Sequence, residues 1–278
     1  MAEITAAAVK TLREMTGLPM MECKRALAEA GGDHDKAIEL LRKAGQKTAE
    51  KQAGRKTAAG RIAVHADMTA GVGAIVELKC ESAPVAAHDE FVALAGDMAR
   101  QLATGPGAAT PDELLAQPSP SKPAMTLKNQ LDELYNRIRE NFQFERMARI
   151  EGPCGGYAHH NGAVGVVLEV EGGTPEVAKD ICMHIAAMRP TVVTKDELDP
   201  AEVAKEREIL SEAARQEGKP ENIIDKMVEG RLRNYYAMYC LEDQVFVKAE
   251  DGKTTVGQVA KQAGMKMKRF LHWELAKE

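Results

Sequence analysis

The sequence predicts an α+β protein with an N-terminal domain of three helices and a core of two related β-hairpin/helix subdomains. Apolar residues recur every three or four positions in roughly the first forty residues, as in amphipathic helices, and alternate with other residues after Gly60, as in strands. A strand-like segment and the helix after it appear again about ninety residues later, which indicates an internal repeat. At 278 residues the chain is long enough for about two compact domains.

Residues 1–55 are expected to form the helical domain. Breaks fall at Gly17-Leu18-Pro19 and Gly31-Gly32, and Asp33 is a candidate N-cap for the third helix. The charged stretch from Lys47 to Lys56 has the composition of a solvated linker. The residues expected to share the faces of the three helices are Ile4, Ala8 and Leu12; Met20, Cys23 and Leu27; and Ala37, Ile38 and Leu41.

The segment from Thr16 to Leu27, followed by Gly31-Gly32-Asp33, resembles the ubiquitin-associated three-helix fold. That fold binds other proteins through an exposed apolar loop, so the resemblance implies an adaptor domain. Met20 and Met21 are neighbours at the start of a helix, which cannot bury both, and methionine suits an adaptable contact surface. Core packing and partner contact are equally open interpretations of this pair.

Residues 56–145 are expected to form the first core subdomain. Ile62, Val64 and Ala66 alternate with other residues, and Gly73 to Lys79 reads as a second strand, so a hairpin is predicted. An amphipathic helix should then cover the hairpin. Its expected apolar face consists of Phe91, Leu94, Ala95, Met98 and Leu102.

The end of this subdomain contains a proline-rich stretch and a further helix. Residues 104–124 carry five prolines among small residues, which is more typical of a surface loop than of a regular element. The helix is expected to lead into the second unit. Its expected apolar residues are Leu127, Leu131, Leu134, Ile138 and Phe142.

Residues 146–278 are expected to form the second core subdomain. Gly165 to Glu171 matches the second strand of the first unit, and a helix with Val177, Ile181, Ile185 and Met188 follows it. Further helices are predicted over residues 200–216 and 220–239, with a short one after residue 255. Residues 267–275 alternate as a strand, although neither face of that strand is cleanly apolar.

Composition restricts the compartment and the partners. A formal net charge of -5 argues against a nucleic-acid partner, because phosphate binding needs a concentrated basic face. The five cysteines are far apart and form no C-x-x-C pair, which favours a reducing compartment. Neither a basic-then-apolar leader nor a run of roughly 18 apolar residues is present, so a cytoplasmic protein without a membrane segment is expected.

The chain carries no common catalytic motif, and neither an enzymatic activity nor a cofactor is expected. It lacks a P-loop, a dinucleotide fingerprint, a G-x-S-x-G elbow and an H-E-x-x-H helix. Cys154, His159, His160, Cys182 and His184 would form a soft-metal site if they met. Adjacent histidines near a turn point apart, and Cys182 and His184 fit a packed helix better. A metalloenzyme is therefore the remote alternative.

Several segments together resemble the elongation factor Ts family over nearly the whole chain. They occur in the order found in that family, which makes the resemblance specific. The segments are Thr16 to Leu27, Val64 to Glu81, Tyr157 to Gly162, Met183 to Ala187 with Pro190, Gly218 to Glu221, Lys226 to Leu232, Cys240 to Val247, and Thr255 to Gly257.

The resemblance implies a non-catalytic partner of the GTPase elongation factor Tu. Members of this family bind elongation factor Tu in its GDP-bound and nucleotide-free forms, displace Mg²⁺ and promote release of GDP. The ubiquitin-associated domain would contact the GTPase domain of elongation factor Tu, and Met20 and Met21 are its candidate contacts. The core would disturb the magnesium and phosphate site from the side.

One of the two intruding segments departs from the family pattern. The family has Thr-Asp-Phe-Val after its first hairpin, whereas this chain has Ser82-Ala83-Pro84-Val85, without the carboxylate and the aromatic ring. His159 matches the second intruding residue and is followed by His160. Two functions therefore remain open: an exchange factor, or a chaperone or reservoir protein that binds elongation factor Tu with weakened exchange activity.

Overall fold

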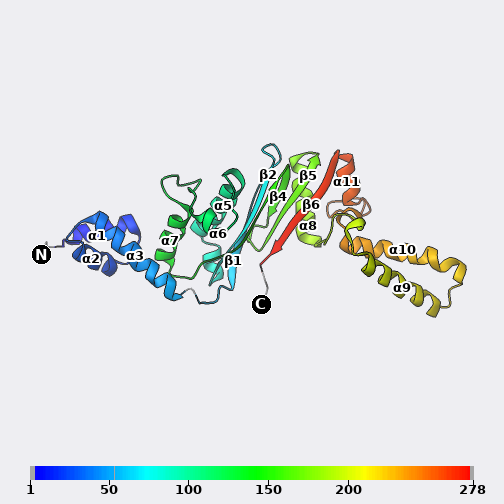
Figure 1. Ribbon diagram of the computed structural model, residues 1–278, viewed down its shortest axis with the longest axis horizontal. Coiled ribbons are helices and arrows are strands. Elements are labelled where there is room, and N and C mark those ends of the chain that lie inside the picture. The colour runs from blue at the N-terminus through cyan, green and yellow to red at the C-terminus, as the bar shows by residue number, and fades with distance from the viewer. Residues whose placement is uncertain (1–3, 53, 276–278) are drawn as a thin grey trace.

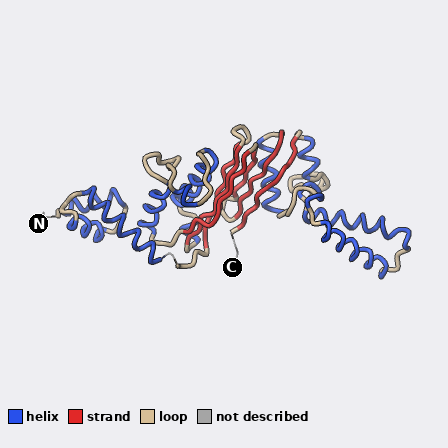
Figure 2. The backbone as a smooth tube through the Cα atoms, viewed as in Figure 1, coloured by secondary structure: helices blue, strands red, loops and turns tan. Residues whose placement is uncertain are grey.

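The computed structural model describes residues 4–52 and 54–275, which form an elongated molecule. The N-terminal helices lie at one end, two β-sheets occupy the middle, and a pair of long helices projects at the other end (Figures 1 and 2). The described part is thus a mixed helix and sheet protein with an N-terminal helical region and antiparallel sheets, as predicted.

The N-terminal region consists of three helices that break where the sequence predicts. They are α1 (Ala6–Thr16), α2 (Met20–Glu29) and α3 (His34–Gln52). Gly17 ends α1 with a φ of 68°, a conformation that glycine adopts without strain. The carboxylate of Asp33 accepts the backbone N–H groups of Asp35 and Lys36 at 3.0 and 3.1 Å, which confirms the predicted N-cap.

Two details of this region differ from the prediction. Helix α3 continues to Gln52, so much of the expected linker is helical. Met20 was expected to share a face with Cys23 and Leu27; those two side chains are fully buried, whereas Met20 is 43% exposed. Met20 is the first residue of α2 and does not belong to the small core of this region.

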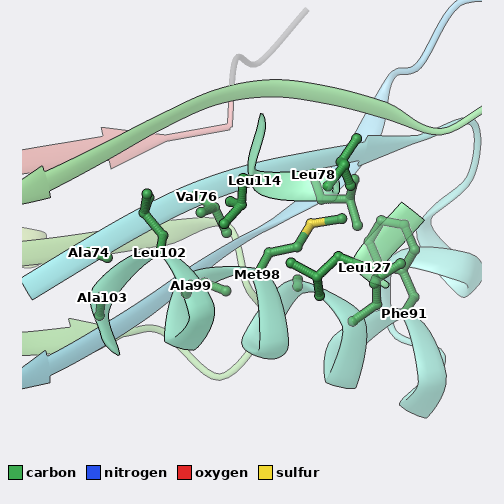
Figure 3. Packing of buried hydrophobic residues seen from close by; sticks show 14 of the residues in the cluster. Ala74, Val76, Leu78, Phe91, Met98, Ala99, Leu102, Ala103, Leu114 and Leu127 are labelled. Atoms are coloured by element: carbon green, nitrogen blue, oxygen red, sulfur yellow. The ribbon is translucent and has the colours of Figure 1, made fainter. Parts of the chain in front are cut away.

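The first sheet contains the predicted hairpin and a third strand that was not predicted. Its strands are β1 (Ala59–Asp67), β2 (Val72–Cys80) and β3 (Gln143–Glu151), antiparallel in the order β1-β2-β3. The sequence of β3 is rich in charged residues and only Ile150 of this strand is buried. It therefore shows no clear alternation of apolar and polar residues. Helix α5 (Asp89–Thr104) packs Phe91, Met98 and Leu102 against β2 (Figure 3).

The proline-rich segment is more ordered than a surface loop. It contains the short helix α6 (Pro111–Leu115), which begins at the N-cap Thr110 and buries Leu114 fully. The hydroxyl groups of Ser119 and Ser121 donate to the buried carboxylate of Asp97 on α5. The expectation of an irregular surface loop is therefore wrong for this part, because leucine burial and buried hydrogen bonds fix it to the core.

Helix α7 (Leu127–Ile138) is shorter than its apolar pattern indicates. Arg139 follows it in the left-handed conformation, with a φ of 64°, and its N–H closes the helix on the carbonyl of Tyr135. Phe142 therefore lies outside the helix, where its ring packs edge-on against Phe91 with 5.3 Å between centroids. It still contributes to the same hydrophobic core.

The second sheet repeats the first. Its strands are β4 (Cys154–Ala158), β5 (Val164–Gly172) and β6 (Met265–Glu274), in the order β4-β5-β6, and α8 (Pro175–Met188) covers it. In both sheets the third strand pairs with the second strand of the hairpin. The helices between α8 and β6 are α9 (Pro200–Gln216), α10 (Glu221–Tyr239) and α11 (Val256–Gln262), with 3₁₀ turns at Lys195–Glu197 and Leu241–Asp243.

A β-bulge explains why β6 shows no clean apolar face. Met267 pairs with Val170 and Arg269 pairs with Glu169, so Lys268 is the extra residue. The bulge reverses the alternation: Met267 packs with Phe270 under α8, whereas Leu271 lies on the opposite face. The sequence alone shows the broken alternation but not its cause.

The two sheets pack face to face and place the helices outside. Ile62 and Ile75 of the first sheet meet Cys154 and Val167 of the second in one buried cluster. Glycine permits the close approach, because a Cβ on Gly165 would lie 2.4 Å from a methyl group of Ile62. The resulting layers are helix, sheet, sheet and helix, with α5 and α8 on the outer faces.

Candidate partner-binding surface

The segment Ser82 to Val85 contains the start of a single helical turn. Strand β2 ends at Cys80, and α4 (Ala83–Ala86) follows with Ser82 as its first flanking residue. Ala83 and Pro84 are exposed, whereas Val85 is partly buried against the first core. Proline is compatible with the first turn of a helix, where its missing N–H has no intrahelical acceptor.

Ser82 is fixed by three contacts. Its backbone N–H and its hydroxyl donate to the two carboxylate oxygens of Glu140, at 3.0 and 2.5 Å. The thiol of Cys80 donates to the carbonyl of Ser82 at 3.3 Å. Burial raises the pKa of Cys80 to about 12, so this thiol keeps its proton at neutral pH. The start of α4 is therefore a defined conformation.

The turn between β4 and β5 presents the two predicted histidines. The N–H of His159 donates to the carbonyl of Val164 at 2.9 Å, and Gly162 closes the turn with a φ of 74°. The hydroxyl of Tyr157 lies 2.7 Å from Nδ1 of His159, which orients the ring. His160 is exposed, and its ring centroid is 4.3 Å from that of His159.

Strand β1 brings the turn and α4 to the same end of the packed sheets. Ala59, at its start, pairs with Cys80, two residues before Ser82. The guanidinium of Arg61 donates to the carbonyl of His160 at 3.1 Å, and the N–H of Ile62 donates to the carbonyl of Gly162 at 2.8 Å. Two segments far apart in sequence thus belong to one end of the packed sheets.

The N-terminal region adds an exposed methionine patch, defined here as Met15, Met20 and Met21. Their exposed fractions are 60%, 43% and 65%, so both methionines of the predicted pair face outward. Met15 was not predicted; it is the second-last residue of α1, close to the break at Gly17. Large apolar side chains that are exposed in this way are candidates for a contact surface.

The cysteine and histidine residues considered as metal ligands are divided among different environments. Nε2 of His184 lies 2.9 Å from Oε1 of Gln244, and its Nδ1 accepts the N–H of Val247 at 3.2 Å. His184 is thus a packed core residue, while His159 belongs to the exposed turn. Among residues 4–52 and 54–275, no three histidine, cysteine or acidic side chains are grouped as metal ligands.

Comparisons with known proteins identify related sequences. The family described as Elongation factor TS matches residues 81–277. Elongation factor Ts of Thioalkalivibrio sulfidiphilus is 41% identical over 275 residues, covering 98% of this chain and 92% of that protein. The Clostridium botulinum protein (strain Eklund 17B) is 40% identical over 283 residues with the same coverage, and that of Methylococcus capsulatus is 41% identical over 275 residues, again with 98% and 92% coverage.

The matches define the class of the protein as a translation elongation factor, acting in protein biosynthesis. The chain belongs to the elongation factor Ts family. In the described part of the chain, no helix is both long and apolar enough to cross a membrane.

Proposed function

We propose that this protein is a guanine nucleotide exchange factor for elongation factor Tu. It binds the GDP-bound and nucleotide-free forms, displaces Mg²⁺ and lets GDP leave, and it catalyses no bond chemistry of its own. The proposal places it in the cytoplasm and requires neither a nucleic acid nor a cofactor. The observation that carries it is the shared end of the two sheets, where α4 and the His159 turn face outward within a chain of this family.

Each exposed segment has a role in this proposal. Residues 1–55 form a ubiquitin-associated-like domain whose Met20 and Met21 contact the GTPase domain of the partner. Residues 56–145 and 146–278 form the two core subdomains. The core directs Ser82 to Val85 and the pair His159 and His160 toward the magnesium site of the partner.

Because the α4 segment departs from the family pattern, the proposed mechanism depends more strongly on His159. Ala83 and Pro84 are exposed but small, and they lack the carboxylate and the aromatic ring of the family pattern. A buried aromatic contact contributes about 2 kcal/mol or more at an interface, so its absence weakens the action of α4 on the partner. Pro84 compensates in part, because its fixed φ lowers the entropy cost of ordering the segment.

The mechanism is a linkage between two ligands of the partner. Magnesium bridges the partner to the nucleotide phosphates, so displacement of its supports removes much of the affinity for GDP. A factor that weakens GDP binding by some ratio is itself weakened by GDP by the same ratio. The complex with both ligands is therefore strained and loses either one readily.

Equilibrium titrations test the proposal. The Kd of elongation factor Tu for GDP is measured with and without saturating protein, and the Kd for the protein is measured with and without GDP. Exchange activity predicts that both Kd values rise by the same factor, at least about fivefold. A binding-only reservoir protein would leave the GDP affinity unchanged, and that result would reject the proposal.

A further inference from the structure

The C-terminal end of α7 holds three separate elements of the molecule. Arg137, in its last turn, forms an ion pair with Glu90 in the first turn of α5. Arg139, directly after the helix, pairs with Glu22 of α2 at 2.5 Å. Glu140 accepts both hydrogen bonds from Ser82. We call Arg137, Arg139 and Glu140 the α7 corner.

The backbone directs these side chains to different neighbours. Arg139 has a φ of 64°, so the chain leaves the helix axis at this residue and Glu140 points toward the end of β2. Helix α7 also contacts the N-terminal region along its length, because Arg42 of α3 pairs with Glu133 at 3.0 Å. Figure 1 shows α7 between the N-terminal helices and the sheets. The α7 corner therefore links the N-terminal methionine patch to α4, which are two parts of the proposed partner surface.

Two of the three links lie next to proposed contact residues. Glu22 directly follows Met21 of the methionine patch, and Ser82 directly precedes Ala83 and Pro84. A helix as short as α4 has little stability of its own, since nucleating the first helical turn is unfavourable. Glu140 supplies two acceptors to the residue that begins α4, which reduces the freedom lost when a partner binds.

We propose that the residues of the α7 corner position α4 and the methionine patch relative to each other, so that both contact the same partner. The inference rests on the proposed exchange function and assigns distinct roles to two of its residues. Glu140 holds α4 in the conformation that acts on the nucleotide site. Arg139 holds α2 and thereby the methionine patch, which contributes to affinity.

The two roles predict opposite kinetic effects. GDP release is followed at increasing concentrations of the protein, which yields a maximal rate and a half-saturating concentration. Glu140→Gln removes the negative charge and one acceptor oxygen, so the hydroxyl of Ser82 must turn to accept from the amide and both hydrogen bonds to Ser82 lose their charge assistance. The maximal rate should therefore fall about fivefold while the half-saturating concentration stays the same. Arg139→Gln should raise the half-saturating concentration about twofold and leave the maximal rate unchanged, because an ion pair that is partly open to solvent contributes little.

Matched variants and a second measurement distinguish positioning from general damage. Asp132→Asn removes a carboxylate that pairs with Lys128 within α7, and it should leave both kinetic values unchanged. Exchanging the charges of the pair, with Glu22→Arg and Arg139→Glu together, should restore the affinity lost in Arg139→Gln. Hydrogen exchange of Glu140→Gln should show lost protection confined to residues 81–90.

These experiments distinguish a failure of this inference from a failure of the proposed exchange function. If the wild-type protein accelerates GDP release and the variants show the opposite effects, the corner has the assigned roles. The inference is overturned if both variants change the two kinetic values together, if neither changes any value, or if protection is lost throughout α7. A wild-type protein that leaves GDP release unaltered rejects the exchange function itself, and hydrogen exchange then still tests whether Glu140 holds α4.

Discussion

His159 combines a fixed ring with an accessible edge. Its Nδ1 is engaged by the hydroxyl of Tyr157, and its backbone closes a turn that is tied to β1 through Arg61 and Ile62. The ring itself is only partly buried and contributes to none of the hydrophobic clusters. A side chain held in this way meets a partner at a small entropy cost.

Replacing His159 with alanine should separate function from stability. We expect the maximal rate of GDP release to fall roughly thirtyfold, which is the size of a contact worth about 2 kcal/mol. The melting temperature should remain that of the wild type, because the turn is closed by backbone groups. Stopped-flow release and a thermal melt measure the two properties. A sharp drop in melting temperature would show instead that His159 is structural.

His184 differs from His159 because its side chain is fully buried. Burial lowers its pKa below the ordinary value, and the hydrogen bond with Gln244 opposes this shift only in part. In the unfolded chain the same side chain titrates near pH 6.5. Below that pH the unfolded state binds a proton that the folded state refuses, so the contribution of His184 to stability is lost as the pH falls.

The pH dependence of unfolding tests this interpretation. Between pH 7.5 and 5.5 the wild-type free energy of unfolding should decrease, and His184→Asn should decrease less steeply, by at most about 1.4 kcal/mol per pH unit. His65 and His272, whose pKa values are also lowered by burial, keep some slope in the variant. Equal slopes in wild type and His184→Asn would contradict the account.

At the residue scale, the sequence indicated the candidate contact residues but not the residues that hold them in place. His159, Met20 and Met21 were predicted from residue type, local pattern and resemblance, and the structure places all three at least partly in solvent. Glu140 could not be found in this way, because it lies 58 residues from Ser82 and its role depends on the fold. The apolar pattern placed it inside the predicted helix, and no local pattern indicates a contact with Ser82.

The elements of the core depend on close contact between two sheets. Gly165 of β5 faces Ile62 of β1, and no side chain larger than hydrogen fits between them without displacement. Gly96, on the outer surface of α5, has no atom within 4 Å of the position of an added Cβ. The same substitution should therefore have opposite effects at the two glycines.

Alanine at each glycine tests the packing of the elements. Gly165→Ala should lower the free energy of unfolding by about 1–3 kcal/mol, as expected for an overpacked core. Gly96→Ala should raise it by about 0.5–1 kcal/mol, because alanine is the better residue within a helix. Urea denaturation measures both. A neutral Gly165→Ala would mean that the sheets lie further apart than the structure shows.

Regular elements were predictable where periodicity or the internal repeat marks them. The two hairpins and the helices α5 and α8 follow from periodicity and from the internal repeat. Strand β3 was missed because its residues are mostly charged, and α6 was missed because prolines obscured the buried Leu114. Pairing partners such as β2 with β3 depend on contacts distant in sequence, which local patterns do not contain.

The whole molecule places the N-terminal helices beside α7 and apart from the second sheet (Figure 2). These helices enclose their own core, which includes Leu12, Cys23 and Leu27. Their contacts with α7 are polar or close-packed, as in the ion pair of Arg42 with Glu133 and the approach of Gly45 to Asn136. We therefore infer that residues 1–55 form a separable domain.

Deleting residues 1–55 tests the domain boundary and the role of the methionine patch together. The remaining chain should unfold cooperatively, with its sheet signal intact in circular dichroism. Its affinity for elongation factor Tu should fall at least about tenfold, since interface side chains such as exposed methionine are lost. A remaining chain that fails to fold would place the boundary elsewhere, and unchanged affinity would remove Met20 and Met21 from the contact surface.

The central claim concerns the whole molecule acting on its partner, and the rate of GDP release measures it most directly. Elongation factor Tu carrying a fluorescent GDP is mixed with excess unlabelled GDP in a stopped-flow instrument, with and without the protein, at fixed Mg²⁺. We expect release to accelerate by at least about tenfold and to saturate with protein concentration, with His159→Ala reaching a much lower maximum. A protein that binds elongation factor Tu but leaves the release rate unchanged would contradict the account.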